Sequence, residues 1–378
     1  MSASFKRTIF DTPRATEYFT IEELQAQTGQ HDYEFFHVCF KELVDNALDA
    51  AESANVSPEI DITVILRDEV ILLMVGDNGV GLNPEVIERI LNFNYRTSDK
   101  AAYRSPTRGL QGNAFKTLIG MPYALGRVTP INIASGGIRH VIRAWVDPAG
   151  EVRTEHRQVP SPITSGTHIS LPLPMREEEQ VFDPLDWAAD FALFNPHAVV
   201  QIRMIDKRGE QSQHADSDPA GIQKMYQSSV VLGDGWRKFL PTDATAIHWY
   251  DTKAFHQLVY SYIGVAERGG RDLPLREFVR QFRGLGRNAP AKLICDAFPE
   301  VRHLSDLTNR DAEIARLHKA MKVATKPPSE NVLGLIGRDH LVANLDRRYG
   351  VKRSWYQKVA ESPSSSRSPL LRPNGWGG

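Results

Sequence analysis

The stretch that decides the fold spans residues 33–54 and reads YEFFHVCFKELVDNALDAAESA. Apolar side chains recur in it at helical spacing and a Ser-Pro pair follows as a stop signal, so the pattern predicts an amphipathic helix. The polar stripe of this helix carries Glu42, Asn46 and Asp49, which stand at i, i+4 and i+7 and therefore share one face. A carboxylate can polarise a water molecule, and an amide oxygen is a ligand that Mg²⁺ accepts. Taken alone, the stripe favours the exposed charged face of an ordinary amphipathic helix.

A second informative segment follows two apolar runs, 60–66 and 70–76, which predict an antiparallel hairpin. Directly after the second run comes DNGVGL, residues 77–82. Asp77 can accept a hydrogen bond from an exocyclic amine such as that of adenine. Gly79 and Gly81 let the backbone approach a flat ligand closely. The same Asp-Asn-Gly sequence is also a strong turn signal by itself.

A third segment begins with the polar, aperiodic residues 93–111, and a loop of roughly this length inside a compact domain is often a functional lid. The motif RGLQGNAFK, residues 108–116, leads into a helix expected from 112 to about 121. Glycines before a helix start favour phosphate, because backbone N–H groups and the helix dipole point there. The spacing fits neither a Walker A loop nor a Rossmann fingerprint. Lys116 is expected at the surface of this helix.

The order of the elements predicts the fold class. After the lid and its helix, β-rich segments are expected at 127–134, 138–146, 150–158 and 167–173. The first 175 residues thus run helix, hairpin, helix, lid, helix, sheet, which predicts an α+β sandwich with helices on one face of a mixed, largely antiparallel sheet. Beyond it we expect a strand at 199–205, helices over 273–325 and a low-complexity tail.

The overall composition restricts the class of protein and its location. The 378 residues are 41% hydrophobic and 24% charged, as in a soluble globular protein of two or three domains. We expect no membrane association, because no apolar run is long enough to cross a bilayer and the N-terminus has no secretory apolar region. Two cysteines exclude a disulfide framework, and a cytoplasmic location is predicted.

Charge is unevenly distributed. The net charge of −1 argues against wholesale coating of nucleic acid, yet residues 271–378 hold 20 Lys and Arg against 11 Asp and Glu. This excess favours either a polyanion partner or simply a solvated basic helical surface.

Together the three segments, with Gly166-Thr167 at a strand start, resemble the GHKL ATPases: gyrase B, Hsp90-type chaperones, histidine kinases and MutL. The resemblance implies a Bergerat fold that binds ATP and Mg²⁺. It implies that Glu42 is the general base, acting on a water near the metal, that Asn46 is the Mg²⁺ ligand and that Asp77 reads adenine. Thr167 would support that aspartate and Gly81 would allow close approach. Further nucleotide contacts are expected from Asp49, Gly79, Ser98, Lys100, Arg108, Gly109, Leu110, Gln111, Gly112 and Asn113.

Within that superfamily the chain is most similar to the B subunit of topoisomerase VI. Residues 108–114, RGLQGNA, stand where that family has Arg-Gly-Gln-Gln-Gly-Ile-Gly, and FNPHA at 194–198 resembles its Asn-Pro-His-Ala. Residues 248–250 and the helices of 273–325 resemble its helix-two-turn-helix insert, and 327–337 the lead-in to its transducer. The sequence departs from the family at Leu110 and Ala114, in the Asp between Ser98 and Lys100, and in lacking a motif for the transducer's switch lysine.

This resemblance implies six segments: an arm at 1–30, a GHKL domain at 31–180, an α+β extension at 181–270, a helix-two-turn-helix-like domain at 271–326, an incomplete transducer-like segment at 327–360 and a disordered tail at 361–378. The implied function is Mg²⁺-dependent ATP hydrolysis in a topoisomerase VI-like assembly. ATP would close the lid and drive homodimerisation through the arm. An A-like cleaving subunit would be a partner, and DNA would contact residues 271–326. Two alternatives stay open: a nucleotide-gated interaction module without topoisomerase activity, for example in a bacterial conflict system, and a non-hydrolysing structural fold.

Overall fold

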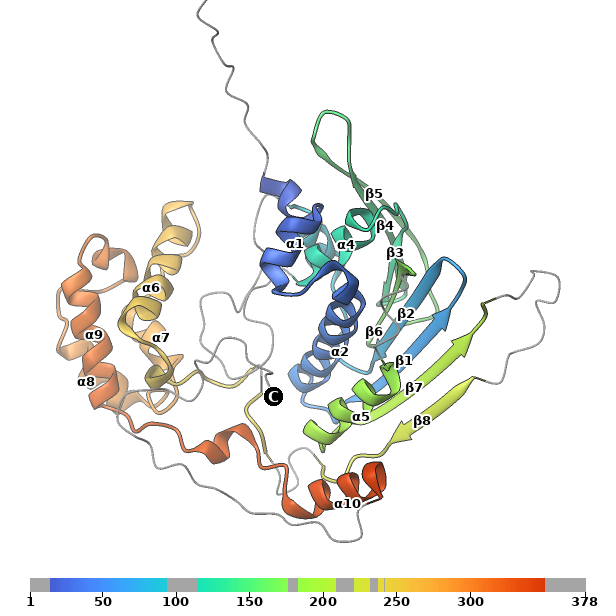
Figure 1. The fold of residues 1–378 in the computed structure, drawn as a ribbon. Helices are drawn as coiled ribbons and strands as arrows, with labels where there is room; N and C mark the ends of the chain where they lie inside the picture. Colours follow the sequence, from blue (N-terminus) through green and yellow to red (C-terminus); the bar gives the residue numbers. More distant parts are fainter. Residues whose placement is uncertain are drawn as a thin grey trace, which may run out of the picture. The chain divides into compact units, whose positions relative to one another are not determined.

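A computed structural model describes residues 14–93, 114–175, 183–208, 221–231, 237–240 and 242–350 (Figure 1). The described residues form two compact units. The first ends at Val231, and the second consists of the described residues from 237 onward. Each unit has its own hydrophobic core.

The first unit is organised around an eight-stranded mixed sheet with the strand order β5-β4-β3-β6-β2-β1-β7-β8. Neighbouring strands are antiparallel except β1 and β7, which are parallel. The strands are β1 (Glu59–Leu66), β2 (Val70–Asp77), β3 (Ile131–Ser135), β4 (Ile138–Val146), β5 (Val152–Pro160), β6 (Thr167–Pro174), β7 (Val199–Asp206) and β8 (Ile222–Tyr226).

Helices cover one face of this sheet (Figure 1). The long helix α2 packs on β2, β1 and β6, while α4 packs on β4 and β6, and α5 on β7 and β8. The helical elements of the unit are the 3-10 turns η1 (Arg14–Tyr18) and η2 (Asp32–Glu34), with α1 (Ile21–Thr28), α2 (Phe35–Ser53), α3 (Pro84–Ile90), α4 (Ala114–Ala124) and α5 (Pro184–Phe194).

The α+β class predicted from the sequence is confirmed, and so are its main elements. The helix expected over 33–54 is α2, and the two apolar runs form the β1–β2 hairpin, in which Ile60 pairs with Asp77. Alternation explains the layers: Ile60, Ile62 and Val64 are buried toward the helices, whereas their neighbours along β1 are not. The helix α5 and the edge strand β8 were not expected, because residues 180–270 carry no clear period.

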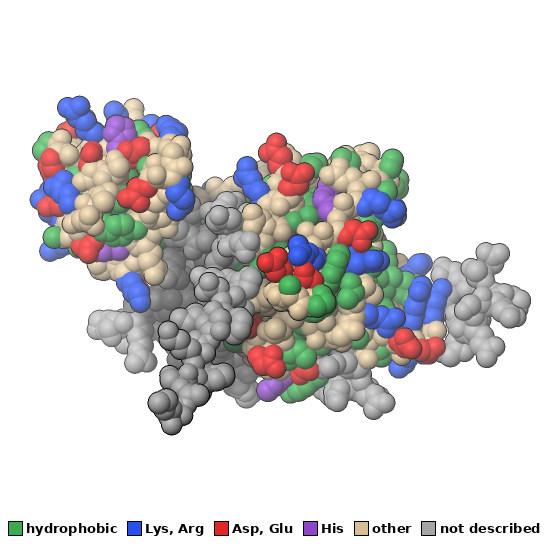
Figure 2. Space-filling view, turned by 90° about the horizontal axis from the view of Figure 1, so that it is seen from above, with side chains coloured by type: hydrophobic (Ala, Val, Ile, Leu, Met, Phe, Trp, Pro, Cys, Tyr) green, Lys and Arg blue, Asp and Glu red, His purple; other side chains and the backbone are tan. Residues whose placement is uncertain are grey.

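The second unit is helical. Its core gathers aromatic rings, with Phe255, Phe278 and Phe282 fully or almost fully buried and in mutual ring contact. Its elements are η4 (Ile247–Trp249), α6 (Thr252–Glu267), α7 (Leu275–Arg280), α8 (Asn288–Asp296), η5 (Leu304–Leu307), α9 (Asp311–Val323), η6 (Glu330–Leu333) and α10 (Arg338–Tyr349). On the face seen in Figure 2, basic and acidic side chains are interspersed over this unit. No helix among the described residues is long and apolar enough to span a membrane.

Candidate functional site

The polar stripe of α2 lies partly sheltered beside its apolar stripe. Leu43, Ala47 and Leu48 are buried in the core of the first unit, which turns the opposite side of the helix away from the core. On that side Glu42 and Asn46 are half-buried. Asp49 is buried, with 9% of its surface exposed. The stripe is therefore partly sheltered from solvent.

Two features of this stripe bear on chemistry. The Nδ2 atom of Asn46 is buried and has no hydrogen-bond partner among the described residues, which is rare for an amide because desolvation without a bond is costly. The Glu42 side chain is 25% exposed, and its Oε1 atom lies 3.3 Å from Nζ of Lys41, which also pairs with Asp45 at 2.9 Å. Burial acts against the charge of Lys41, but Asp45 and Glu42 raise its pKa overall.

Asp77 is the last residue of β2, and one of its two carboxylate oxygens accepts hydrogen bonds from the described residues. Its Oδ1 atom accepts the backbone N–H of Gly79 at 2.8 Å and that of Thr167 at 3.3 Å. No described residue donates to its Oδ2 atom. Burial raises the pKa of the Asp77 carboxyl to about 6, although both backbone bonds act in the opposite direction. The carboxyl is thus fixed in direction and retains one oxygen for a ligand.

The turn after Asp77 packs so closely that it requires glycine. A Cβ on Gly79 would stand 2.5 Å from the backbone carbon of Ala50 in α2, so this turn rests directly on the helix that carries Asn46. At Gly81 φ is +77°, and a Cβ there would stand 2.7 Å from Oγ of Ser135. Asn78 closes the turn, because its side chain accepts from the N–H of Glu59 and donates to a carbonyl at 3.0 Å each.

Sheet register aligns three residues of the site. Asp77 on β2 is paired with Thr167 on β6, and Thr167 is paired with Ser135 on β3. The Ser135 hydroxyl accepts the N–H of Leu82 at 2.9 Å and donates to the carbonyl of Gly166 at 2.8 Å. It therefore ties the Gly81 turn to the start of β6. Sequence reasoning missed Ser135, since only the pairing of three strands that are distant in sequence gives it this role.

The segment 194–198 joins α5 to β7 and contacts the far end of α2. His197 Nε2 lies 2.9 Å from Oε1 of Glu52, and both side chains are fully buried. Asn195 donates to the carbonyl of Phe191 at 2.8 Å, so it ends α5. Glu52 lies on α2 three residues beyond Asp49 and was not among the predicted site residues.

The expected loop residues cannot be placed. Ser98, Lys100, Arg108, Gly109, Leu110, Gln111, Gly112 and Asn113 all lie outside the described residues. Among the residues that could be placed, the prediction for Lys116 was wrong: its side chain is 1% exposed, because α4 packs with that side against η1 and the end of α3.

Comparison with known proteins agrees with this geometry. Residues 31–177 match the family described as histidine kinase-, DNA gyrase B-, and HSP90-like ATPase. The B subunit of type 2 DNA topoisomerase 6 from Natronomonas pharaonis is 27% identical over 234 residues, 59% of this chain and 28% of the relative. Its counterpart from Sulfurisphaera tokodaii is 22% identical over 331 residues, 81% of this chain and 54% of the relative. Protein MICRORCHIDIA 4 of Arabidopsis thaliana is 36% identical over 78 residues, 21% of this chain and 9% of the relative.

The chain thus spans at most about half the length of these relatives. The matched residues 31–177 include Glu42, Asn46, Asp77 and Thr167. The resemblance to the B subunit of topoisomerase VI expected from the motifs is confirmed.

Proposed function

We propose that this chain binds ATP with Mg²⁺ between α2 and the end of β2 and hydrolyses it. One observation supports the proposal: among the described residues, a carboxylate with one unengaged oxygen and an amide with an unsatisfied Nδ2 atom stand on neighbouring elements, the end of β2 and α2. Asp77 is fixed by two backbone N–H groups on one oxygen, and the turn after it rests on α2, where the Nδ2 atom of Asn46 has no partner in the described structure.

The strand end fits adenine. The Oδ2 atom of Asp77 can accept a hydrogen from the exocyclic amino group, while Oδ1 stays engaged with the backbone. Gly79 and Gly81 present backbone without Cβ atoms, so a planar base can lie against the turn. Thr167 supports the aspartate through its N–H, and the register with Ser135 keeps that strand edge in place.

The helix stripe fits phosphates and a hard cation. An amide has both an oxygen, which Mg²⁺ prefers, and N–H donors, which a phosphate oxygen accepts, so Asn46 can serve both. Asp49 lies one turn further along and completes the same face. Bound Mg²⁺ would supply charge neutralisation on the phosphates.

Glu42 is the proposed general base. It lies one turn from Asn46 on the same face and would orient and deprotonate the attacking water, since phosphoryl transfer needs mainly positioning and charge stabilisation. Lys41 contacts Glu42 and Asp45 together and so helps to hold the first part of this stripe. Residues 98–113 are proposed to wrap the phosphates as a lid that ATP closes, in the way the resemblance implies.

We extend the proposal to the assembly in which the ATPase would act. ATP would drive homodimerisation through the arm, and a topoisomerase VI A-like subunit would be the partner, with 327–360 as a partial transducer. The helix-two-turn-helix-like region would contact DNA, which is supported by five exposed side chains that form no ion pair with a carboxylate of the described residues: Arg276, Arg280, Arg283, Arg287 and Lys292. They follow one another along α7, the turn after it and α8.

Hydrolysis assays with three alanine variants test the proposal. Glu42→Ala is expected to abolish hydrolysis and to retain nucleotide, whereas Asn46→Ala and Asp77→Ala are expected to lose nucleotide binding. Equal hydrolysis by Glu42→Ala and the wild type would remove Glu42 from its role. Stimulation of turnover by DNA, and relaxation of supercoiled DNA with an A-like subunit, would support the assembly. A turnover rate that neither DNA nor an A-like subunit changes would favour the nucleotide-gated module.

A further inference from the structure

Lys116 occupies an unusual position for a lysine. It lies in the first turn of α4, its side chain is 1% exposed, and its Nζ atom donates to the backbone carbonyl of Asn92 at 2.5 Å. Asn92 stands just after α3 and α4 begins at Ala114. This hydrogen bond therefore joins the first turn of α4 to the backbone just after α3.

The same ammonium reaches a third element. It lies 6.0 Å from the ring centroid of Tyr18, the last residue of η1, which is within the range of a cation–π contact. Rings continue the packing, since Phe93 stands 5.9 Å from Tyr18 and 5.0 Å from Phe19. We refer to Tyr18, Phe19, Asn92, Phe93 and Lys116 as the Lys116 junction.

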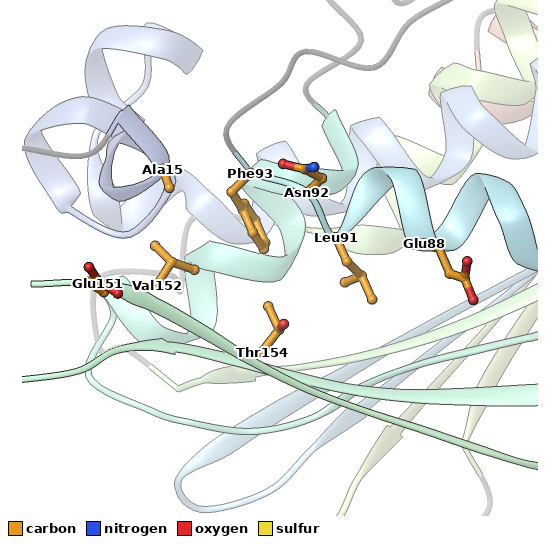
Figure 3. Close-up of a pocket in the computed structure, with 8 residues that line it drawn as sticks. All are labelled: Ala15, Glu88, Leu91, Asn92, Phe93, Glu151, Val152 and Thr154. Carbon is orange, nitrogen blue, oxygen red and sulfur yellow. The ribbon is translucent and has the colours of Figure 1, made fainter.

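Backbone contact makes this junction tight on the α4 side. Gly120 lies one turn beyond Lys116, and a Cβ there would overlap the backbone carbonyl of Tyr18. On the other side, the junction borders a cavity of about 510 Å³, lined by Ala15, Asn92 and Phe93 and by Val152 of the edge strand β5 (Figure 3). The turn η1 is thus packed on α4 and Phe93, with a cavity where β5 faces it.

Stability alone gives no reason for a lysine here. Burial lowers the pKa of Lys116, which means that the site disfavours the ammonium relative to water. A methionine has a similar length and no charge to desolvate, so it would fill the same space at less cost. Methionine would lose, among other contacts, the N–H bond to Asn92 and the attraction to the Tyr18 ring. The lysine therefore orients the three elements.

We infer that Lys116 is a positioning residue of the proposed ATPase site, one that makes nucleotide affinity depend on the N-terminal turn η1. It fixes the first turn of α4, where backbone N–H groups favour phosphate, against both Asn92 and Tyr18. This inference rests on the proposed function. Its consequence is that a change at η1, more than 90 residues away in sequence, acts on the phosphate end of the site through Lys116.

A double-mutant cycle tests the inference. Lys116→Met and Tyr18→Leu are each expected to weaken the binding of a non-hydrolysable ATP analogue about tenfold, and the double variant is expected to lose no more than either single one. Melting of the nucleotide-free Lys116→Met protein should stay at or above the wild-type temperature. Lys224→Met, which removes an exposed lysine of β8, is the matched control and should match the wild type.

Three outcomes overturn the inference. Unchanged analogue affinity in Lys116→Met removes the positioning role. A lower melting temperature with unchanged affinity shows that the lysine only stabilises the fold, and fully additive losses in the double variant show that η1 acts by another route. If the wild type itself binds no analogue, both the proposed function and this inference are contradicted. If the wild type binds the analogue and the variants behave as in one of these three outcomes, only the inference is contradicted.

Discussion

Replacing Asp77 by asparagine is expected to stabilise the nucleotide-free protein and to abolish nucleotide binding. The two side chains have the same shape, so an amide oxygen can still accept the N–H groups of Gly79 and Thr167, which lie 2.8 and 3.3 Å from Oδ1. The change removes a negative charge that burial disfavours, because the pKa of Asp77 is raised from 3.8 to about 6. It also puts an N–H₂ group where Oδ2 would accept the adenine amino group, so two donors would face each other.

The magnitude follows from proton linkage. Between the ordinary pKa and the raised one, the folded protein binds more protons at Asp77 than the unfolded chain, so wild-type stability falls as pH rises through that window. The loss is complete above the raised pKa and amounts to about 3 kcal/mol in the free energy of unfolding. The asparagine variant has no such loss. Its advantage is therefore about 3 kcal/mol at pH 8 and roughly half of that at pH 5.

Denaturant unfolding at pH 8 and pH 5, with and without an ATP analogue and Mg²⁺, measures both effects. Asp61→Asn is the matched control, because Asp61 is an exposed carboxylate on the neighbouring strand β1, paired with Gly76. A lower stability of Asp77→Asn than of the wild type at pH 8, or stabilisation of the variant by the analogue, would contradict this prediction. A pH-independent difference between variant and wild type would show that the charge of Asp77 is not its cause.

Three further changes have defined outcomes. Gly79→Ala puts a Cβ against the α2 backbone and should destabilise the protein by about 1–3 kcal/mol and weaken analogue binding; Gly286→Ala, whose Cβ would meet nothing closer than 3.7 Å, is the control in the same unfolding and binding assays. His197→Ala should lower the free energy of unfolding by about 3–5 kcal/mol, because it leaves Glu52 buried without that contact. A double cycle with Glu52→Ala should then show strong coupling, and additivity would contradict it. Burial lowers the pKa of His318 to about 4, so the second unit should lose about 3 kcal/mol as pH falls from 7 to 4; in His318→Phe this slope should be absent from acid-unfolding curves.

Local patterns predicted on which elements the residues of the proposed site stand, where that placement depends on local sequence alone. The spacing of Glu42 and Asn46 fixes them on one helix face whatever the rest of the chain does, and a strand that ends in Asp77 with glycines behind it defines its own turn. Ser135 could not be found in this way, because its hydroxyl acts on the Gly81 turn only after β3, β6 and β2 have paired in register.

Lys116 was predicted at the surface, but the structure buries it. A cation in a helix is ordinarily placed on the solvent side, and the sequence offers no signal that η1 and the end of α3 will cover it. The covering elements are separated from it by about 100 and about 25 residues, so the burial of this lysine is a tertiary effect. Glu52 is similar: its place on the helix was readable, but its partner His197 stands 145 residues away.

The stripe of α2 has two parts that differ in their contacts, although its sequence pattern is continuous. At the C-terminal end the buried Glu52 carboxylate is in contact with His197. Gly79 rests on Ala50, which places the Asp77 end of the site beside the middle and last turns of α2. Glu42 lies eight residues earlier, about 12 Å along the helix axis. If Asp77 holds adenine, phosphates that extend along α2 away from Glu52 would run toward Asn46 and Glu42, the residues proposed as metal ligand and general base.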